Sequence, residues 1–210
     1  MSGPRPSRQS GAAPQPSSAT SRSLLERVRA ADAAAWAQLV TLYAPLVMHW
    51  CRGWDLREQD IADVLQEVFQ AVFGSIARFR KERPGDTFRG WLRTVTHNKV
   101  RDHWRRLGRE PGGVGGTDAQ RRLAQVPGPG PAEVDSEAPE AAERALFFRA
   151  LELIRGDFAE RTWQAFWRTA VDGRAPRDVA AELSLSPGAV RVAKSRVLHR
   201  LREELGDLLE

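Results

Sequence analysis

The sequence contains a single cysteine, Cys51, among its 210 residues. One cysteine excludes an internal disulfide and a metal site built from several cysteines, and it fits the reducing cytoplasm in which we expect the protein to act. The sequence also lacks any apolar run of about 18 residues, so it predicts no membrane insertion. Residues 1–20 have no apolar segment that would make them a secretory signal.

Strand signals and catalytic clusters are missing as well. We find no alternating run of Val, Ile and Thr and no Asn-Gly hairpin turn. The four histidines, at positions 49, 97, 103 and 199, are scattered, and Tyr43 is the only tyrosine. The sequence therefore predicts no catalytic site, no cofactor and no metal. A metal site at Asp63 and Glu67 is a weaker option, because no nearby histidine completes it.

The composition divides the chain into four parts. Residues 1–20 are mostly Pro, Ser, Gly and Ala and are predicted to form a disordered tail. Residues 107–140 are interrupted throughout by Gly and Pro and are predicted to form a flexible linker. The parts between and after them, 21–106 and 141–210, have the apolar content of two small domains.

Apolar residues recur at steps of three and four in both domains, which is the period of an α-helix. The clearest case is 60–79, where one stripe runs from Ile61 to Phe79. The fold class is therefore all-α, with two small helical domains. The predicted helices are 22–30, 33–50, 60–79, 89–106, 141–155, 157–172, 176–183 and 187–206.

Charge separates two surfaces within the first domain. Residues 55–68 contain five carboxylates and one arginine, whereas residues 78–109 contain eleven Lys and Arg residues and three carboxylates. Aromatic residues such as Trp91 and Trp104 are interleaved with these cations. Cations that neutralise phosphates and rings that stack on bases suit single-stranded nucleic acid. The alternative is a solvated basic face over a core that contains both tryptophans.

The second domain contains a helix-turn-helix pattern. A short helix with Val179, Ala180 and Leu183 is followed by the tight connection 184–186. Ser186 is a good N-cap, and proline suits the next position because no amide donor is needed there. The following helix carries many cations on its outer faces, as a helix in the major groove of DNA does. An ordinary helical hairpin with a charged surface is the alternative.

Two stretches of the chain resemble parts of one known family. DVLQEVFQAVFGSIARFR followed by DTFRGWLRTVTHNKVRDHWRR is similar to region two of bacterial sigma factors. VAAELSLSPGAVRVAKSRVLHRLREEL is similar to region four. Their order and the intervening linker resemble the extracytoplasmic-function group of the sigma-70 family. The resemblance implies a protein that binds core RNA polymerase and directs promoter recognition and transcription initiation.

The resemblance also implies a role for individual residues. In the first domain, the helix 60–79 is similar to the one that docks on the clamp helices of the polymerase. Carboxylates and an amide on an exposed face suit a basic coiled coil, although a solvated acidic face is the alternative. The residues expected to bind core polymerase are Asp60, Asp63, Leu65, Gln66, Glu67 and Phe69.

Promoter DNA is the second partner that the resemblance implies. The loop 81–87, with Pro84 and Gly85, and the helix after it resemble the part that opens the minus-ten element and holds a flipped base. The candidates there are Phe88, Arg89, Trp91, Arg93, His97, Asn98, Arg101, Arg105 and Arg106. The second domain is expected to read the minus-thirty-five element through Arg191, Lys194, Ser195, Arg196, His199 and Arg200.

Other functions stay open on the sequence alone. A stand-alone helix-turn-helix regulator would bind duplex DNA without polymerase, but it leaves the acidic and basic surfaces of the first domain unexplained. A nuclease or recombinase would need clustered carboxylates or an activated nucleophile. If the protein is a sigma factor, an anti-sigma factor that covers both domains is a further possible partner, because many members of the group are controlled in that way.

Overall fold

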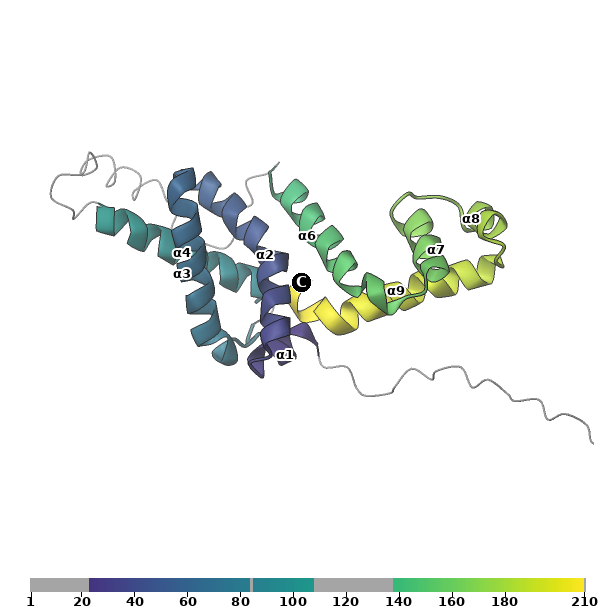
Figure 1. Cartoon of the computed structure of the whole chain (residues 1–210), viewed down its shortest axis with the longest axis horizontal. Coiled ribbons are helices and arrows are strands. Elements are labelled where there is room, and N and C mark those ends of the chain that lie inside the picture. Colours follow the sequence, from purple (N-terminus) through teal and green to yellow (C-terminus); the bar gives the residue numbers. More distant parts are fainter. Residues whose placement is uncertain (1–22, 84, 108–137, 210) are drawn as a thin grey trace, which may run out of the picture.

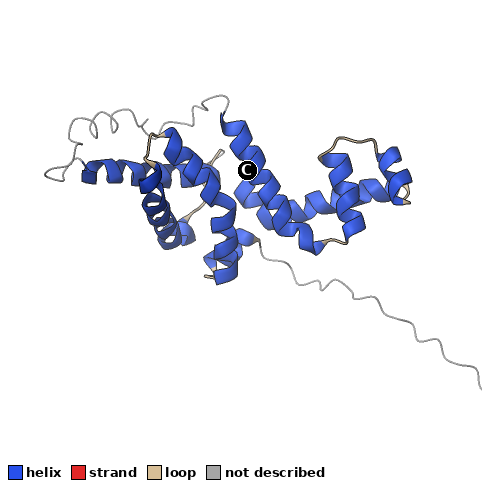
Figure 2. Cartoon of the chain, turned by 45° about the horizontal axis from the view of Figure 1, so that its top comes forward, coloured by secondary structure: helices blue, strands red, loops and turns tan. Residues whose placement is uncertain are grey.

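The computed structural model describes residues 23–83, 85–107 and 138–209, and the regular elements in these ranges are all helices (Figure 2). The predicted tail and residues 108–137 of the predicted linker lie outside the described residues. The helices are α1 (Leu24–Arg29), α2 (Ala33–Gly53), α3 (Glu58–Ser75), η1 (Ile76–Arg78), α4 (Phe88–Leu107), α6 (Ala138–Ile154), η2 (Arg155–Asp157), α7 (Glu160–Ala170), α8 (Pro176–Leu183) and α9 (Pro187–Leu209).

The predicted all-α fold is confirmed, and each predicted helix is present with small shifts at its ends. The prediction for 60–79 ran too far, since α3 ends at Ser75 and tightens into the 3₁₀ turn η1. The prediction for 157–172 began too early, because residues 155–157 form the turn η2. Helix α6 begins at Ala138, inside the segment predicted to be linker.

The helices of the first half pack around α2, which contacts α1, α3 and α4. One side of each helix supplies apolar residues to this core. Residues Leu39, Tyr43 and Val47 of α2 are buried, as are Val64, Val68 and Val72 of α3 and Leu92 and Val100 of α4. The spacing of three and four residues that predicted these helices is therefore the spacing of their buried faces.

The helix-turn-helix has a small core of its own. Ala165 of α7, Val179 and Ala180 of α8, and Val190 and Ala193 of α9 form it, and the alanines let the three helices approach closely. Ser184 ends α8 in the left-handed conformation with φ of 50°. Two residues later, the Ser186 hydroxyl accepts the backbone N–H of Ala189 at 3.1 Å. This N-cap confirms the turn predicted at 184–186.

The two halves share one larger core. Helix α9 extends from the helix-turn-helix towards the first half, and its C-terminal end contacts α1 and α4 (Figure 1). Helix α6 lies along α2 and is also in contact with α9. Buried residues from Leu24 to Leu208 accordingly form one continuous cluster. Among the described residues, no helix is long and apolar enough to span a membrane.

Candidate nucleic-acid interface and polymerase-binding helix

Helix α4 presents one outward stripe and one buried face. At about 100° of turn per residue, Trp91, Thr94, Asn98, Arg101 and Arg105 fall within about 80° of one another. Asn98 and Arg105 are exposed, and Trp91 and Arg101 are half-buried. The stripe therefore combines a ring, an amide and two guanidinium groups along one side of the helix. We call these five residues the α4 stripe.

A pocket of about 460 Å³ lies at the N-terminal end of the α4 stripe. Trp91 and Thr94 line it from α4, and Phe79 and Arg80 line it from the segment before the loop. The rings of Phe79 and Trp91 lie 5.1 Å apart between centroids. The guanidinium of Arg29 donates to the carbonyl oxygen of Phe79 at 2.7 Å, which fixes this wall of the pocket. The lining combines the ring of Trp91 and the guanidinium groups of Arg78 and Arg80 with the carboxylates of Glu82 and Asp86. The ring suits a nucleobase and the guanidinium groups suit its phosphate.

The loop before α4 is held in shape by its own side chains. One carboxylate oxygen of Asp86 accepts the backbone N–H groups of Glu82, at 3.0 Å, and Arg83, at 2.8 Å. The Thr87 hydroxyl accepts the N–H of Gly90 at 2.9 Å, within the first turn of α4. This loop was predicted to take part in the site, but none of its residues was predicted as a site residue. An Asp or Thr just before a helix, as at 86 and 87, was the available signal.

Five of the predicted DNA contacts on α4 lie away from the α4 stripe: Phe88, Arg89, Arg93, His97 and Arg106. Phe88 and His97 are buried, so their side chains are part of the packing and not of a surface. Phe88 contacts the ring of Tyr43, with centroids 5.1 Å apart. The guanidinium of Arg93 lies 6.0 Å from the Trp54 ring, and Arg89 forms an ion pair with Glu143 of α6 at 2.5 Å. The structure thus gives these residues partners within the protein.

On helix α3, too, some of the predicted polymerase-binding residues are exposed and others are buried or paired within the protein. Asp63 and Gln66 are exposed, whereas Phe69 is buried and Leu65 is half-buried. Two carboxylates face α4: Asp60 lies 3.6 Å from His103, and Glu67 pairs with Arg106 at 2.7 Å. The predicted DNA contact Arg106 is therefore joined to a predicted polymerase contact. Asp63 and Gln66 are the two members of the predicted set that are exposed.

Helix α3 also carries an exposed aromatic residue that was not predicted from the sequence. The Phe73 side chain is 56% exposed and packs edge-on against Trp36 of α2, with ring centroids 5.1 Å apart. Because Phe73 belongs to the apolar stripe from Ile61 to Phe79, it was expected to lie in the core. That stripe is wider than the face that one helix buries, which indicates that a residue at its edge reaches the surface.

The recognition helix presents its cations on more than one side. Arg191, Lys194 and Ser195 are exposed and fall within about 100° of one another around α9. Arg196 is also exposed but lies about 140° from Arg191. Arg200 is about 180° from Arg191, and its guanidinium pairs with Asp157 at 2.7 Å. Exposed His199 lies 3.2 Å from Glu203. The outer face of the helix-turn-helix is therefore made by 191, 194 and 195.

Ion pairs join α8 to α7 on the side of the helix-turn-helix that is away from its outer face. The carboxylate of Glu182 on α8 accepts Arg168 of α7 at 2.8 Å and also pairs with Arg174. The Arg174 hydrogen bond is the main cause that lowers the pKa of Glu182, with Arg168 adding to it. Both partners belong to the segment before α8. The bridge therefore fixes α8 relative to α7 without using a residue of the outer face.

The remaining chemistry-bearing residue, Cys51, is buried in α2. Burial raises the pKa of its thiol to about 12, so it stays protonated and unreactive. In the part of the chain that the structure describes, no three side chains of His, Cys, Asp or Glu come together as a metal site.

Comparison with known proteins identifies the family. Residues 39–110 match the family model described as Sigma-70 region 2. RNA polymerase sigma factor CarQ of Myxococcus xanthus is 29% identical over 188 residues, which cover 88% of this chain and 97% of that protein. RNA polymerase sigma factor CnrH of Cupriavidus metallidurans is 30% identical over 190 residues, covering 88% and 94%.

A solved structure is also similar in sequence over most of its length. The structure of CnrH in complex with the cytosolic domain of CnrY is 25% identical, covers 85% of this chain and 92% of that chain, and has a TM-score of 0.35. Further relatives carry the name ECF RNA polymerase sigma factor, including ShbA of Streptomyces griseus, which is 30% identical over 189 residues that cover 85% of this chain and 92% of that protein. The chain belongs to the extracytoplasmic-function group of the sigma-70 family of RNA polymerase sigma factors.

Proposed function

We propose that this sigma factor, which binds core RNA polymerase and directs it to promoters, reads promoter DNA with two separate surfaces. The α4 stripe and the pocket at its end take the exposed strand of the minus-ten element. The outer face of α9 takes the duplex of the minus-thirty-five element. This division follows from the chemistry of the two surfaces, since one has rings for unstacked bases and the other has a helix that fits the major groove.

The observation that carries the first half of the proposal is the continuity of the α4 stripe with the pocket. A base that leaves the duplex loses its stacking, and the half-buried ring of Trp91, which the buried Phe79 supports from behind, can replace it. Stacking of a base on an aromatic side chain contributes about 1–3 kcal/mol. Asn98 and Arg101 follow on the same side, where an amide suits a base edge and a guanidinium suits a phosphate.

The second half rests on the exposed face of the helix-turn-helix. Arg191 lies in the first two turns of α9, so its guanidinium is placed to reach a guanine edge, and Lys194 and Ser195 follow on the same face. Each surface alone binds weakly. Holding both on one polymerase raises the effective concentration of each at its element without any new contact.

The acidic side of α3 is proposed to hold the polymerase. Asp63 and Gln66 are exposed there without any contribution to the core, and a carboxylate and an amide suit a basic helical partner. Phe73 and Trp36 add an apolar contact beside them. Glu67 can bind the polymerase only after its ion pair with Arg106 is replaced by one with a cation of the polymerase.

The protein is proposed to act in the cytoplasm and without a catalytic site of its own, since the polymerase performs the chemistry. A stand-alone helix-turn-helix regulator is not favoured, because the similarity to sigma factors extends over 88% of the chain and includes its first half. That half has no part in a regulator that binds duplex DNA alone.

Run-off transcription tests this function. Purified core polymerase is supplied with a pool of promoters from the source genome, with and without the protein. Discrete transcripts that appear only with the protein support the proposal. Absence of transcripts, together with failure to co-purify with core polymerase, contradicts it. An Arg191→Ala, Lys194→Ala variant should lose most of the signal, and Arg202→Ala, an exposed arginine further along the same helix, serves as the matched control.

A further inference from the structure

Helix α9 exposes an apolar side chain beside the residues proposed to read the duplex. Val192 is 51% exposed, and it belongs to neither of the apolar clusters among the described residues. The other two large apolar side chains exposed in the part of the chain that the structure describes each have a ring beside them. Phe73 packs against Trp36, and the rings of Phe147 and Phe148 lie 6.2 Å apart between centroids. The packing of the protein does not explain Val192 in the same way.

Helix stability does not explain a valine at this position either. A β-branched side chain loses rotamer freedom in a helix, so valine is a poorer helix former than alanine, lysine or arginine. The exposed residues nearest to it on α9 are Arg191, Ser195 and Arg196, all polar. The same branching holds the two methyl groups of Val192 in one preferred orientation. They are thus preorganised for an apolar contact and lose little entropy when it forms.

The Val192 side chain points away from the protein, in the direction in which a recognition helix faces DNA. At about 100° per residue, it lies about 160° from the buried Val190. Ser195 lies about 60° to one side of it, and Arg196 lies about 40° to the other. The residue one turn earlier on the same side is Gly188, which has no side chain to cover it. The approach to Val192 from the preceding turn is therefore open.

Cations flank Val192 on both sides. Arg191 and Arg196 are exposed and lie about 140° apart, and Ser195 and Val192 lie between them. A helix in the major groove runs between two phosphate backbones. Long cations at its flanks can hold phosphates or reach across to a base edge, while the shorter residues between them meet the bases. The face that reads the duplex therefore extends past Ser195 to Val192.

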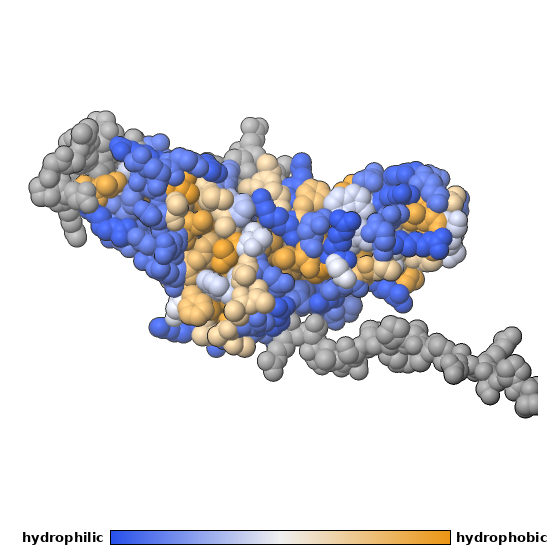
Figure 3. All heavy atoms as spheres, viewed as in Figure 1, coloured by the Kyte–Doolittle hydropathy of each residue, from blue (hydrophilic) through white to orange (hydrophobic). Residues whose placement is uncertain are grey.

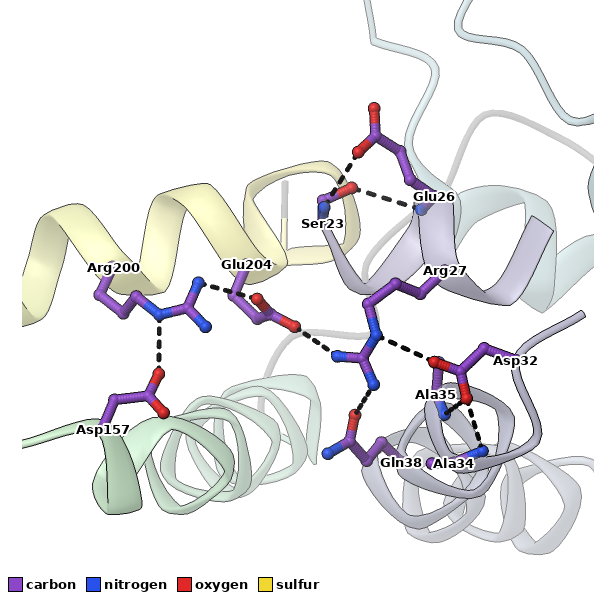
Figure 4. Close-up of polar contacts among 10 residues, drawn as sticks. All are labelled: Ser23, Glu26, Arg27, Asp32, Ala34, Ala35, Gln38, Asp157, Arg200 and Glu204. Atoms are coloured by element: carbon purple, nitrogen blue, oxygen red, sulfur yellow. Dashed lines mark hydrogen bonds and ion pairs between the residues drawn. The ribbon is translucent and has the colours of Figure 1, made fainter. Parts of the chain in front are cut away.

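The next cation around the helix is turned back to the protein. Arg200 lies about 40° beyond Arg196. Its guanidinium donates to Asp157 at 2.7 Å and to Glu204 at 2.8 Å (Figure 4). With these partners Arg200 does not serve a phosphate, so Arg196 marks the edge of the side of α9 that faces DNA.

The major groove offers one apolar group to a side chain such as Val192. Its base edges carry hydrogen-bond donors and acceptors, and thymine adds its C5-methyl group. Valine cannot replace the water that a polar base edge loses on contact, so contact with such an edge is unfavourable. Contact with the thymine methyl instead buries apolar surface of both partners. The chemistry of Val192 therefore selects a T·A pair.

We propose that Val192 is a specificity-determining residue of this sigma factor, whose methyl groups pack on the C5-methyl of a thymine in the minus-thirty-five element. This inference rests on the proposed reading of the duplex by α9. Adjacent residues rise by about 1.5 Å along a helix, whereas base pairs are about 3.4 Å apart. The thymine therefore lies within about two base pairs of the base that Arg191 contacts.

A scan with deoxyuridine tests the contact at the level of one methyl group. The probe is a duplex fragment of a promoter recovered by run-off transcription, and each thymine of its minus-thirty-five element, on either strand, is replaced in turn. Deoxyuridine keeps the hydrogen-bonding groups of thymine and lacks the methyl. Binding is measured by fluorescence anisotropy with polymerase that carries the full chain. One substitution should weaken binding roughly fourfold, as expected for the loss of one buried methyl group.

Variants then connect that thymine to Val192. Val192→Ala removes the two terminal methyl groups, so it should bind the thymine and deoxyuridine duplexes equally. Arg196→Ala is the matched control, because it removes the exposed neighbour of Val192. It should weaken binding to both duplexes and keep the roughly fourfold ratio between them. The melting temperature of Val192→Ala should not fall below that of the wild type, because no core contact is lost.

The outcomes separate this inference from the proposed function. A flat deoxyuridine scan, an element without thymine, a wild-type ratio in Val192→Ala or a lower melting temperature of that variant overturns the inference. The proposed reading of the duplex is tested by the Arg191→Ala, Lys194→Ala variant in run-off transcription. If that variant transcribes like the wild type, the proposed function fails. If it loses transcription while the scan is flat, only the role of Val192 fails.

Discussion

Two arginines of α4 should respond differently to the same substitution. Arg105 lies on the α4 stripe with its side chain exposed, whereas Arg89 lies on the other side of the helix and pairs with Glu143. Replacing either one with alanine removes one positive charge from the same helix. If net charge alone drives DNA binding, the two variants behave alike. If the geometry of the helix matters, only Arg105→Ala weakens binding.

The size of the effect follows from counterion release. Each phosphate contact on a single strand contributes about 0.7 to the slope of log affinity against log salt. Loss of the Arg105 contact should therefore reduce the magnitude of this slope by about 0.7. At 0.15 M salt, relative to a 1 M reference, that corresponds to roughly fourfold weaker binding. The ion pair of Arg105 with Asp102 is exposed at 3.5 Å and contributes little to stability. Arg89→Ala should leave both the slope and the affinity unchanged, because Arg89 pairs with Glu143 and does not lie on the α4 stripe.

Fluorescence anisotropy provides the assay. A labelled single-stranded oligonucleotide with the non-template minus-ten sequence is titrated with polymerase carrying each variant, at four or more salt concentrations. Thermal unfolding of each free variant controls for loss of structure. Equal loss of slope in both variants, or a larger loss for Arg89→Ala, would refute the assignment of the outward face of α4.

Three further predictions follow from local structure. Ser184→Gly should raise the free energy of unfolding by about 0.5–1 kcal/mol and the Tm by a few degrees, because glycine adopts the left-handed φ of 50° without strain, and calorimetry would show no gain if that strain is absent. Since Arg174 and Arg168 lower the pKa of Glu182 in the folded state, its stabilising effect should be complete above its usual pKa of 4.5 and be lost as the pH falls below it, and Glu182→Gln should remove that part of the acid dependence of the melting temperature. The thiol of Cys51 should react with a maleimide at neutral pH only after denaturant is added, and rapid reaction of the native protein would contradict its burial.

Local structure was the most predictable part of this protein. The apolar spacing in α3, the Ser186 cap and the small residues Ala180 and Ala193 each follow from a rule that involves only neighbouring residues. The predicted end of α3 was wrong where the chain tightens into the 3₁₀ turn at Ile76. There the N–H of Phe79 bonds the carbonyl three residues back instead of four, and the apolar spacing does not distinguish the two.

The direction in which each side chain points around a helix was also predictable, and it would have narrowed the predicted DNA-binding residues. Counting about 100° per residue puts Arg200 opposite Arg191, so one recognition face cannot contain both. The same count separates Arg89 from Asn98 on α4. These assignments needed only the sequence and the period of the helix.

The contact between the two halves was beyond such counting. Leu205 and Leu208 continue the apolar stripe of α9, but the stripe does not say which helices cover it. Glu204 sits among charged neighbours in the sequence and gives no sign that it is buried between two arginines. Contacts such as that of Arg27 with Glu204 join residues far apart in the chain, and only the folded structure identifies them. Figure 3 shows the result, with hydrophobic residues gathered in the middle of the face and hydrophilic ones towards α3 and α8.

Crosslinking in the assembled polymerase complex tests the central claim most directly. A photoreactive amino acid is placed at Asn98 on α4 in one variant and at Lys194 on α9 in another, and each crosslink is mapped on the same promoter. We predict that position 98 marks the non-template strand near minus ten and that position 194 marks the duplex near minus thirty-five, roughly 25 base pairs away. Crosslinks from both positions within one short stretch of DNA, or from neither, would contradict it.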